Sequence, residues 1–406
     1  MALYIWRAFF MNILLFDDEK RIELLPLAYT RPCAGLRVGI LTIAEKWAHL
    51  LSASISYITQ EYLSEKYTSK YENENLFING RILPTPELID QLYNLEDSSC
   101  LIQEDTIVAF KTTQPLKNLT EITQHVQQTK PIHVACNCIN HTYDIFAKNG
   151  DEIRSDFELL THGKQTAQLS QSNLIIGEDI FIEDGVNAEA VVFNTTNGPI
   201  YLGKNSTVME GSLIRGPFSL GENATVKMGA KIYGDTTIGP QCKVGGEVSN
   251  SVFYANSNKA HDGFLGNSVI GEWCNLGADT NSSNLKNNYA SVKLWNYSKQ
   301  RFINTNLQFC GLIMADHSKC GINTMFNTGT IVGVSANIFG GNFPRNYIPS
   351  FTWGGASGFA TYQTNKAFQT SRIVMERRNM TFTKVEENIL TDIFNQTAEY
   401  RFWEKN

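Results

Sequence analysis

The sequence has little of three features that would point to particular classes of protein. No apolar run reaches the roughly 18 residues that a membrane-spanning helix needs, so no membrane association is predicted. Charged residues make up 18% of the chain and the net charge is −6, which argues against nucleic acid as the main partner. None of the eight cysteines forms a CxxC pair, so we predict buried, reduced thiols and no metal site.

The first ten residues, MALYIWRAFF, are a poor secretion signal. Arg7 interrupts the apolar run, no A-x-A cleavage site follows, and Asp17 and Asp18 come soon after. We therefore expect a cytoplasmic protein. Met11 precedes a plausible first strand, so the start codon is either Met1 or Met11.

A repeat of six residues dominates the middle of the chain. Most of the residues two positions before each repeated aliphatic are small, and glycine often follows the aliphatic. Neither a helical period of 3.6 nor a strand period of 2 explains this spacing. The eight successive aliphatic positions are Leu202, Val208, Ile214, Leu220, Val226, Ile232, Ile238 and Val244.

The repeat predicts a parallel β-helix shaped as a triangular prism. Each six-residue unit supplies a short strand and a corner, so three units form one coil of about 18 residues, and coils stack about 4.8 Å apart. The aliphatic side chains fill the prism. The period does not determine the handedness, because parallel crossovers are usually right-handed.

At 406 residues the chain is long enough for more than one domain. We predict an α/β domain over residues 11–165, the β-helix over 166–345 and a helical extension over 346–406. The first range alternates apolar strands with helical stretches, which is an α/β pattern.

Within these ranges, individual elements can be predicted. Strands are expected at Asn12–Phe16 and Leu76–Asn79, and a helix at Ile43–Leu51. Two further helices are expected at 361–378 and 382–404.

Two segments of the β-helix resemble a known family. They are His261-Asp-Gly-Phe-Leu-Gly266 and Asn275-Leu-Gly-Ala278, followed by Ser283-Asn284. They resemble the bifunctional enzymes that acetylate glucosamine-1-phosphate and then uridylylate it, in particular an alternative bacterial branch of that family. The resemblance covers roughly 165–350. It implies a left-handed β-helix, an amino-sugar phosphate as acceptor, acetyl-CoA as co-substrate, nucleotide-sugar synthesis and a homotrimer.

The N-terminal region resembles sugar nucleotidylyltransferases less closely. The segment Leu25-Pro-Leu-Ala-Tyr-Thr-Arg-Pro32 is similar to the one that follows their glycine-rich, phosphate-binding loop. The corresponding loop here, residues 16–21, contains no glycine. Arg81 follows the strand after which those enzymes carry an Asp for Mg²⁺, and Arg offers no oxygen ligand, so Mg²⁺ is doubtful. Arg21 and Arg31 are the candidate substrate-binding residues.

His261 is the predicted general base of acyl transfer. The attacking amine must lose a proton, and an imidazole with a pKa near neutrality can accept it. The alternative is a loop histidine bonded to the backbone. His317 is the competing candidate, and Asn275 is a candidate for binding the sugar or the acyl carbonyl.

The resemblance implies further contacts to substrate and co-substrate. Basic and amide side chains near the motif are candidates for the sugar phosphate, namely Lys259, Asn284 and Lys243. Positions in the C-terminal coils are candidates for coenzyme A, namely Ser335, Ala336 and Arg345.

Three functions are compatible with the sequence. The first is a glucosamine-1-phosphate N-acetyltransferase, with or without uridylyl transfer. The second is a nucleotidylyltransferase for another sugar phosphate, in which the β-helix serves assembly. The third is a non-catalytic β-helix scaffold.

Overall fold

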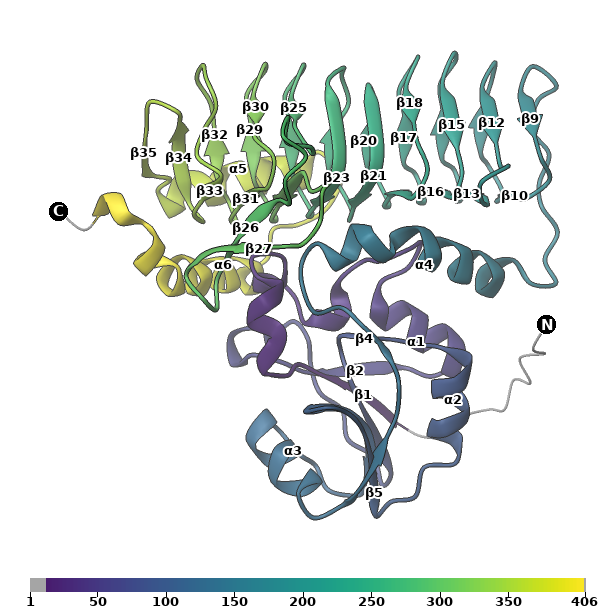
Figure 1. The fold of residues 1–406 in the computed structure, drawn as a ribbon, viewed down its shortest axis with the longest axis vertical. Coiled ribbons are helices and arrows are strands. Elements are labelled where there is room, and N and C mark those ends of the chain that lie inside the picture. Colours follow the sequence, from purple (N-terminus) through teal and green to yellow (C-terminus); the bar gives the residue numbers. More distant parts are fainter. Residues whose placement is uncertain (1–11, 405–406) are drawn as a thin grey trace. The chain divides into compact units, whose positions relative to one another are not determined.

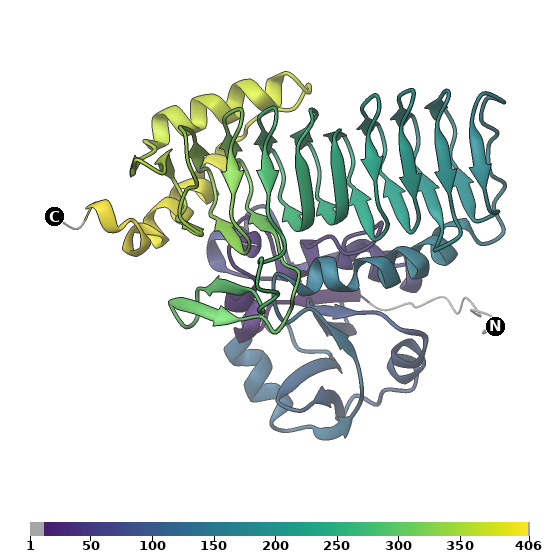
Figure 2. The same ribbon diagram turned by 45° about the horizontal axis from the view of Figure 1, so that its top comes forward.

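A computed structural model describes residues 12–404 (Figures 1 and 2). The chain divides into two compact units. The first contains residues 12–24, 30–36 and 41–141, and the second contains residues 25–29, 37–40 and 142–404. The alternative start at Met11 lies outside the described residues. No helix within 12–404 combines the length and apolarity needed to cross a membrane.

The first unit is built on a six-stranded sheet whose central strands are buried on both faces. The strand order is β2-β1-β3-β6-β5-β7, with β2, β1 and β3 parallel and β6 antiparallel to both of its neighbours. Every residue of β1 and β3 is buried, which accounts for their continuous apolar runs. The strands are β1 Asn12–Phe16, β2 Ile55–Ile58, β3 Asn75–Asn79, β5 Ser99–Gln103, β6 Thr106–Thr112 and β7 Lys130–His133, beside the separate pair β4 Ile82–Leu83 and β8 Asn137–Cys138.

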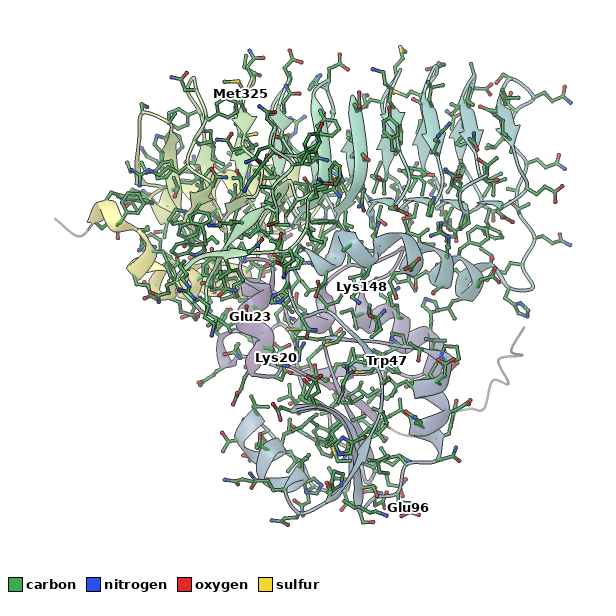
Figure 3. The ribbon with its side chains drawn as sticks, viewed as in Figure 1. Lys20, Glu23, Trp47, Glu96, Lys148 and Met325 are labelled. Atoms are coloured by element: carbon green, nitrogen blue, oxygen red, sulfur yellow. The ribbon has the colours of Figure 1, made fainter. Side chains whose placement is uncertain are left out.

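Three helices flank this sheet, and each begins at a side-chain cap. In α1, Ile43–Leu51, Thr42 and Glu45 form a reciprocal capping box. Trp47 of this helix, labelled in Figure 3, is fully buried. Its indole N–H donates to the Ile82 carbonyl oxygen at 3.0 Å. The other two helices are α2 Pro86–Tyr93 and α3 Leu119–Val126, and the short 3-10 turns are η1 Glu19–Leu24, η3 Cys33–Gly35 and η4 Glu61–Leu63.

The second unit is the predicted β-helix. Val208 pairs with Val226 and Val226 with Val244, so successive coils are in register 18 residues apart. All eight six-residue aliphatics belong to one buried core. This core explains the repeat, because each inward position stacks on an apolar side chain of the next coil.

The strands of the β-helix form two large sheets. One has ten strands, and these are β11 Asn187–Ala188, β14 Thr207–Val208, β17 Thr225–Val226, β20 Lys243–Val244, β22 Asn258–Lys259, β24 Asn275–Leu276, β29 Lys319–Cys320, β32 Asn337–Ile338, β34 Thr352–Gly355 and β35 Gly358–Thr361. The other has fifteen strands, and these are β9 Leu174–Ile176, β10 Ile180–Ile182, β12 Val192–Asn194, β13 Ile200–Leu202, β15 Leu213–Arg215, β16 Phe218–Leu220, β18 Lys231–Ile232, β19 Thr236–Ile238, β21 Glu247–Phe253, β23 Phe264–Ile270, β25 Asn281–Ser282, β28 Leu312–Met314, β30 Met325–Phe326, β31 Thr330–Val332 and β33 Tyr347–Ile348.

An antiparallel hairpin interrupts the coils after β25. Its strands are β26 Lys293–Asn296 and β27 Arg301–Asn304. The chain then returns to the prism at β28, so residues 283–311 are an insertion into the repeat. The short turns η2 Leu27–Tyr29, η5 Ala398–Tyr400 and η6 Phe402–Glu404 also belong to this unit.

Three helices pack on the β-helix. The helix α4, Asp144–Thr161, runs along the coils (Figure 1), and its Asn149 amide donates to the Asp235 carbonyl oxygen at 2.8 Å. Near the C-terminus, α5 spans Thr364–Glu376 and lies across the coils in Figure 2. It is followed by α6, Lys384–Gln396, which begins with a capping box at Thr383.

The predicted fold class is confirmed: an α/β region precedes a parallel β-helix with terminal helices. The coils are consistent with the left-handed form that the resemblance implies. Strands β33 and β34 show that coil-like pairing continues after residue 345. The domain limits 11–165, 166–345 and 346–406 stay predictions. All eight cysteines are free.

Candidate functional site

A cleft of about 710 Å³ lies beside His261, where the repeat is interrupted. Gly263 occupies the turn between β22 and β23 with φ of +110°, and a Cβ there would lie 2.2 Å from the Thr280 carbonyl oxygen. His261 is exposed in this turn. The residues that line this His261 cleft are Lys243, Asn256, Asn258, Ala260, His261, Trp273, Cys274, Asn275, Leu276, Gly277, Ala278, Lys319, Ile322, Thr370, Val374, Arg377 and Arg378.

One wall of the His261 cleft is a column of polar residues on the ten-stranded sheet. Lys243 pairs with Asn258, Asn258 with Asn275, and Asn275 with Lys319 on successive strands. The Asn258 amide donates to the Asn275 side-chain oxygen at 3.4 Å. The structure therefore brings three predicted site residues, His261, Asn275 and Lys243, to one cleft.

The His261 cleft is strongly cationic. Lys243, Lys319, Arg377 and Arg378 line it, and none of the described residues in its lining is Asp or Glu. Arg378 donates to the Asn258 side-chain oxygen at 2.9 Å and also to the Gln241 carbonyl oxygen. Such a concentration of positive charge favours an anionic ligand. Asp262 and Asp279 line a smaller neighbouring hollow of about 410 Å³, which His261 also borders.

Lys259 does not face the cleft. It occupies the inward register of Val244 and is 1% exposed. Its ammonium group donates to the carbonyl oxygens of Gly245, His261 and Asp262 at 3.1, 2.9 and 3.3 Å. Burial lowers its pKa from 10.5 to about 8. This side chain therefore holds the backbone of the His261 turn from inside the prism and is not positioned to touch substrate.

Lys319 is a second lysine with a depressed pKa. Burial lowers its pKa to about 8, and its ammonium donates to the His317 carbonyl oxygen at 2.8 Å. Unlike Lys259, it lines the His261 cleft. The Lys319 ammonium group therefore lies close to neutral amide groups in the cleft. A phosphate or carboxylate bound there would compensate its positive charge.

His317 lies outside the lining of the His261 cleft. Its Nδ1 is 3.2 Å from the Ser371 hydroxyl of α5, and its ring lies nearly parallel to that of Trp273, with centroids 6.4 Å apart. The structure thus places His317 between the coils and α5, next to the cleft but not in it.

The other predicted contacts to substrate and coenzyme A are not gathered at His261. Asn284 donates to the Asn267 side-chain oxygen at 2.8 Å and does not line the cleft. Ser335 and Ala336 are 2% and 1% exposed. The Arg345 guanidinium lies 5.1 Å from the centre of the Phe402 ring and lines a different pocket.

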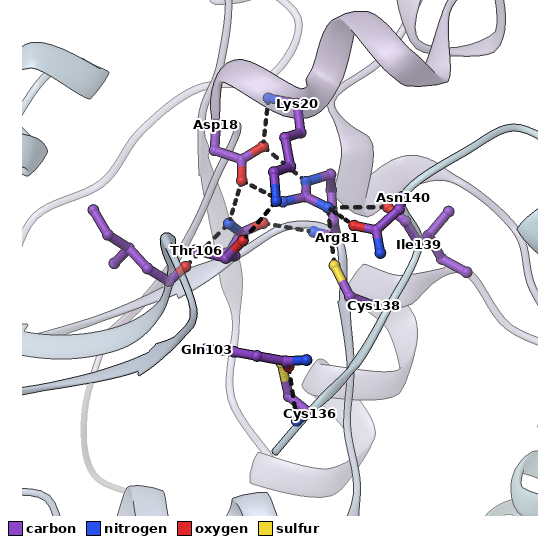
Figure 4. Close-up of polar contacts among 11 residues, drawn as sticks. Asp18, Lys20, Arg81, Gln103, Thr106, Cys136, Cys138, Ile139 and Asn140 are labelled. Carbon is purple, nitrogen blue, oxygen red and sulfur yellow. Dashed lines mark hydrogen bonds and ion pairs between the residues drawn. The ribbon is translucent and has the colours of Figure 1, made fainter. Parts of the chain in front are cut away.

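In the first unit, the position predicted to lack a metal ligand holds a buried ion pair. Arg81 is completely buried, and its Nε lies 2.7 Å from an oxygen of Asp18, with a second contact between Nη2 and the other oxygen (Figure 4). Asn79 donates to the same carboxylate at 2.8 Å, and Asn140 accepts from Arg81 at 2.8 Å. Burial alone would raise the pKa of Asp18, but Arg81 lowers it.

Arg21 and Arg31, the candidate substrate-binding residues of this unit, are 8% and 5% exposed. Arg21 donates to the Tyr62 hydroxyl at 2.9 Å and lies 3.4 Å from Asp17. Their roles toward a substrate stay predictions. Over residues 12–404, no three His, Cys, Asp or Glu side chains are grouped so that they could hold a metal ion.

Sequence reasoning missed Arg377 and Arg378. Both directly follow α5, in a stretch predicted only to be helical, and the adjacent pair of arginines was the available signal. Lys319 was missed because the insertion after β25 hides its register with Asn275.

Parts of the chain are similar to known proteins. Residues 13–165 match a family model described as sugar nucleotidyl transferase. A stretch of 87 residues is 36% identical to the bifunctional protein GlmU of Methanocaldococcus jannaschii, covering 21% of each chain. The same length is 31% identical to the protein of that name from Methanococcus aeolicus, covering 21% of this chain and 20% of that one. The chain thus matches about a fifth of the length of these curated relatives.

These matches confirm the predicted resemblance to the bifunctional family and to sugar nucleotidyl transferases. Among solved structures, an Arabidopsis UDP-N-acetylglucosamine acyltransferase aligns with 14% identity and a TM-score of 0.26. That alignment covers 58% of this chain and 98% of that one. Similarity at this TM-score supports no conclusion about activity.

Proposed function

We propose that this chain is an acyl-CoA-dependent transferase that acetylates the amino group of a sugar phosphate, with glucosamine-1-phosphate as the expected acceptor and UDP-N-acetylglucosamine synthesis as its setting. The observation that carries the proposal is the His261 cleft, whose described lining combines an exposed imidazole with four basic side chains and contains no carboxylate. The family resemblance and the partial matches to bifunctional proteins support the same conclusion.

In the proposed reaction, each group at the cleft has one task. His261 accepts the proton that the amine loses as its nitrogen bonds to the thioester carbonyl carbon. The carbon–sulfur bond then breaks, and coenzyme A leaves as the thiol, with the proton returned by His261. Asn275, one strand from Asn258, offers an amide N–H to the oxyanion that develops on that carbonyl. The basic residues bind the sugar phosphate, since arginine matches phosphate oxygens with two parallel N–H groups.

The direct test is thiol release from acetyl-CoA with a panel of acceptors. We expect release with glucosamine-1-phosphate or a closely related amino-sugar phosphate, and little with the amino sugar that lacks the phosphate. Absence of both acetyl transfer and coenzyme A binding would favour the non-catalytic scaffold.

Arg377→Met should raise KM for the sugar phosphate about tenfold or more, with a smaller change in kcat. Arg377 is exposed and lines the cleft, so its loss removes an attraction that the ground state and the transition state share. Steady-state kinetics measures both constants. Lys366→Met is the matched control, because Lys366 is an exposed cation of α5, the helix that Arg377 directly follows, and lies outside the cleft. Equal KM values for the two variants would contradict the phosphate-binding role.

We also propose a homotrimer, the assembly that the family resemblance implies. Flat prism faces suit closed rotational symmetry. Sedimentation equilibrium is expected to give three times the mass of the 45.6 kDa chain. A stable monomer with full activity would contradict this assembly.

Nucleotidylyl transfer is the second candidate function, favoured by the family match over residues 13–165. We expect it to be slow or absent, because the loop at residues 16–21 lacks glycine and Arg81 already pairs with Asp18. The measurement is pyrophosphate release from UTP or dTTP with sugar-1-phosphates and Mg²⁺. Rapid, Mg²⁺-dependent release would show that this unit binds its nucleotide with other residues.

A further inference from the structure

A second pocket, of about 820 Å³, lies between the β26–β27 hairpin, the coils and the C-terminal turns η5 and η6. It shares no lining residue with the His261 cleft. Its volume falls within the range of small-molecule sites, roughly 300–1,000 Å³. We call it the hairpin pocket. Of the residues predicted to serve acetyl transfer, Arg345 alone lines it.

The hairpin pocket is lined with aromatic rings that are already fixed in place. Trp295 of the hairpin stacks on Tyr347 of the coils, with ring centroids 4.2 Å apart and planes 10° from parallel. Phe302 meets Trp295 edge to face at 5.6 Å. Phe302 and Phe402 line the pocket and keep 41% and 43% of their surface exposed. Preformed aromatic surfaces of this kind suit a planar ring.

The same pocket carries an excess of positive charge. Lys286, Lys293 and Arg345 line it, against a single carboxylate, Glu399. Gln300 donates to that carboxylate at 3.4 Å. The Arg345 guanidinium is held over the Phe402 ring at 5.1 Å, and Lys293 is exposed. A purely apolar ligand would leave the basic side chains without a partner group, and a sugar phosphate would leave the aromatic rings without one.

We propose that the hairpin pocket binds a nucleoside phosphate, with the base against the exposed rings of Phe302 and Phe402 and the phosphates beside Lys293 and Arg345. Base stacking on aromatic side chains and phosphate binding by Arg and Lys are the two interactions that this chemistry needs. Two sources share it: the phosphorylated adenosine of coenzyme A, and a free or sugar-linked nucleotide such as UDP. With coenzyme A as the ligand the proposal rests on the proposed acetyl transfer and adds a binding site for its donor; with a free or sugar-linked nucleotide it goes beyond that function. The pocket shares no lining residue with the His261 cleft.

The test is isothermal titration of the full-length protein with coenzyme A and, separately, with UDP. Adenosine and inorganic phosphate serve as half-ligands. At least one nucleotide is expected to bind, and each half-ligand about tenfold or more weakly, because each lacks one of the two interactions. Lys293→Glu and Phe302→Ser should each weaken nucleotide binding about tenfold or more. Lys204→Glu, an exposed lysine outside both pockets, is the matched control and should bind normally.

The variants that lose nucleotide binding show which ligand binds and whether it binds in the hairpin pocket or in the His261 cleft. Binding of coenzyme A alone, lost in Lys293→Glu, assigns the pocket to the acyl donor. Binding of UDP that is likewise lost in Lys293→Glu assigns it to a free or sugar-linked nucleotide. The proposal is overturned if neither nucleotide binds, or if Lys243→Glu in the His261 cleft abolishes binding while Lys293→Glu does not. Because the titration needs no acceptor and no turnover, its result is independent of whether acetyl transfer occurs.

Discussion

Replacing His261 with alanine is expected to lower kcat for acetyl transfer by about 10²–10⁴, the scale for losing a positioned base. An ammonium group cannot attack a thioester, so the amine must lose a proton on the way to the transition state. His261 is exposed in its turn, and its removal leaves no buried cavity. Thermal stability and coenzyme A binding should therefore be nearly unchanged, and thiol release at saturating substrate measures the loss.

His317→Ala is the matched control for this experiment. His317 contacts Ser371 and Trp273 and does not line the His261 cleft, so its loss should reduce turnover less. If His261→Ala keeps more than about a third of the wild-type rate while His317→Ala abolishes activity, the two roles are exchanged. Full activity in both variants would refute an acyltransferase site here.

The β-helix could be predicted from sequence because its constraint is local and repeated. Each inward position, such as Val226, is covered by the coils before and after it, so the six-residue period appears directly in the chain. His261 and Asn275 could also be predicted from sequence, because they lie in consecutive coils and within the two neighbouring segments that resemble the bifunctional family.

The rest of the site depends on contacts that sequence spacing does not reveal. Lys259 is a charged residue at an inward position, and only the three carbonyl oxygens around its ammonium explain how it is accommodated. Arg377 and Arg378 reach the cleft because α5 packs across the coils, which is a tertiary event. The overall charge composition of the chain does not predict that four basic side chains gather at the His261 cleft.

The N-terminal unit shows the same limit in another form. The absence of a metal ligand at Arg81 could be predicted from the residue type alone. Its partner could not, because Asp18 and Arg81 are 63 positions apart and meet only through the parallel pairing of β1 with β3. The Asp18–Arg81 ion pair stands where the similar enzymes carry an Asp for Mg²⁺. Removing either partner of this pair therefore tests how much it stabilises the first unit.

Asp18→Asn is expected to destabilise the first unit by about 3–5 kcal/mol, because it leaves a completely buried guanidinium without its counter-charge. Arg81→Met should cost less, about 1–3 kcal/mol, since the Asp18 side chain left behind keeps 15% exposure and can be partly hydrated. The double variant should be more stable than the sum of the two effects predicts, which is the signature of a coupled pair. Hydrogen exchange of β1 and β3 measures the loss within this unit.

The pH dependence gives an independent check on the same pair. Arg81 lowers the pKa of Asp18 in the folded protein below its ordinary 3.8, so the unfolded chain binds the proton more tightly. The stability that Asp18 contributes is therefore complete above pH 3.8 and is lost as the pH falls through the lowered pKa. The difference in unfolding free energy between wild type and Asp18→Asn should be constant near neutral pH and shrink in acid. A difference that stays constant down to the acid limit of folding would show that the pair is not ionised as described.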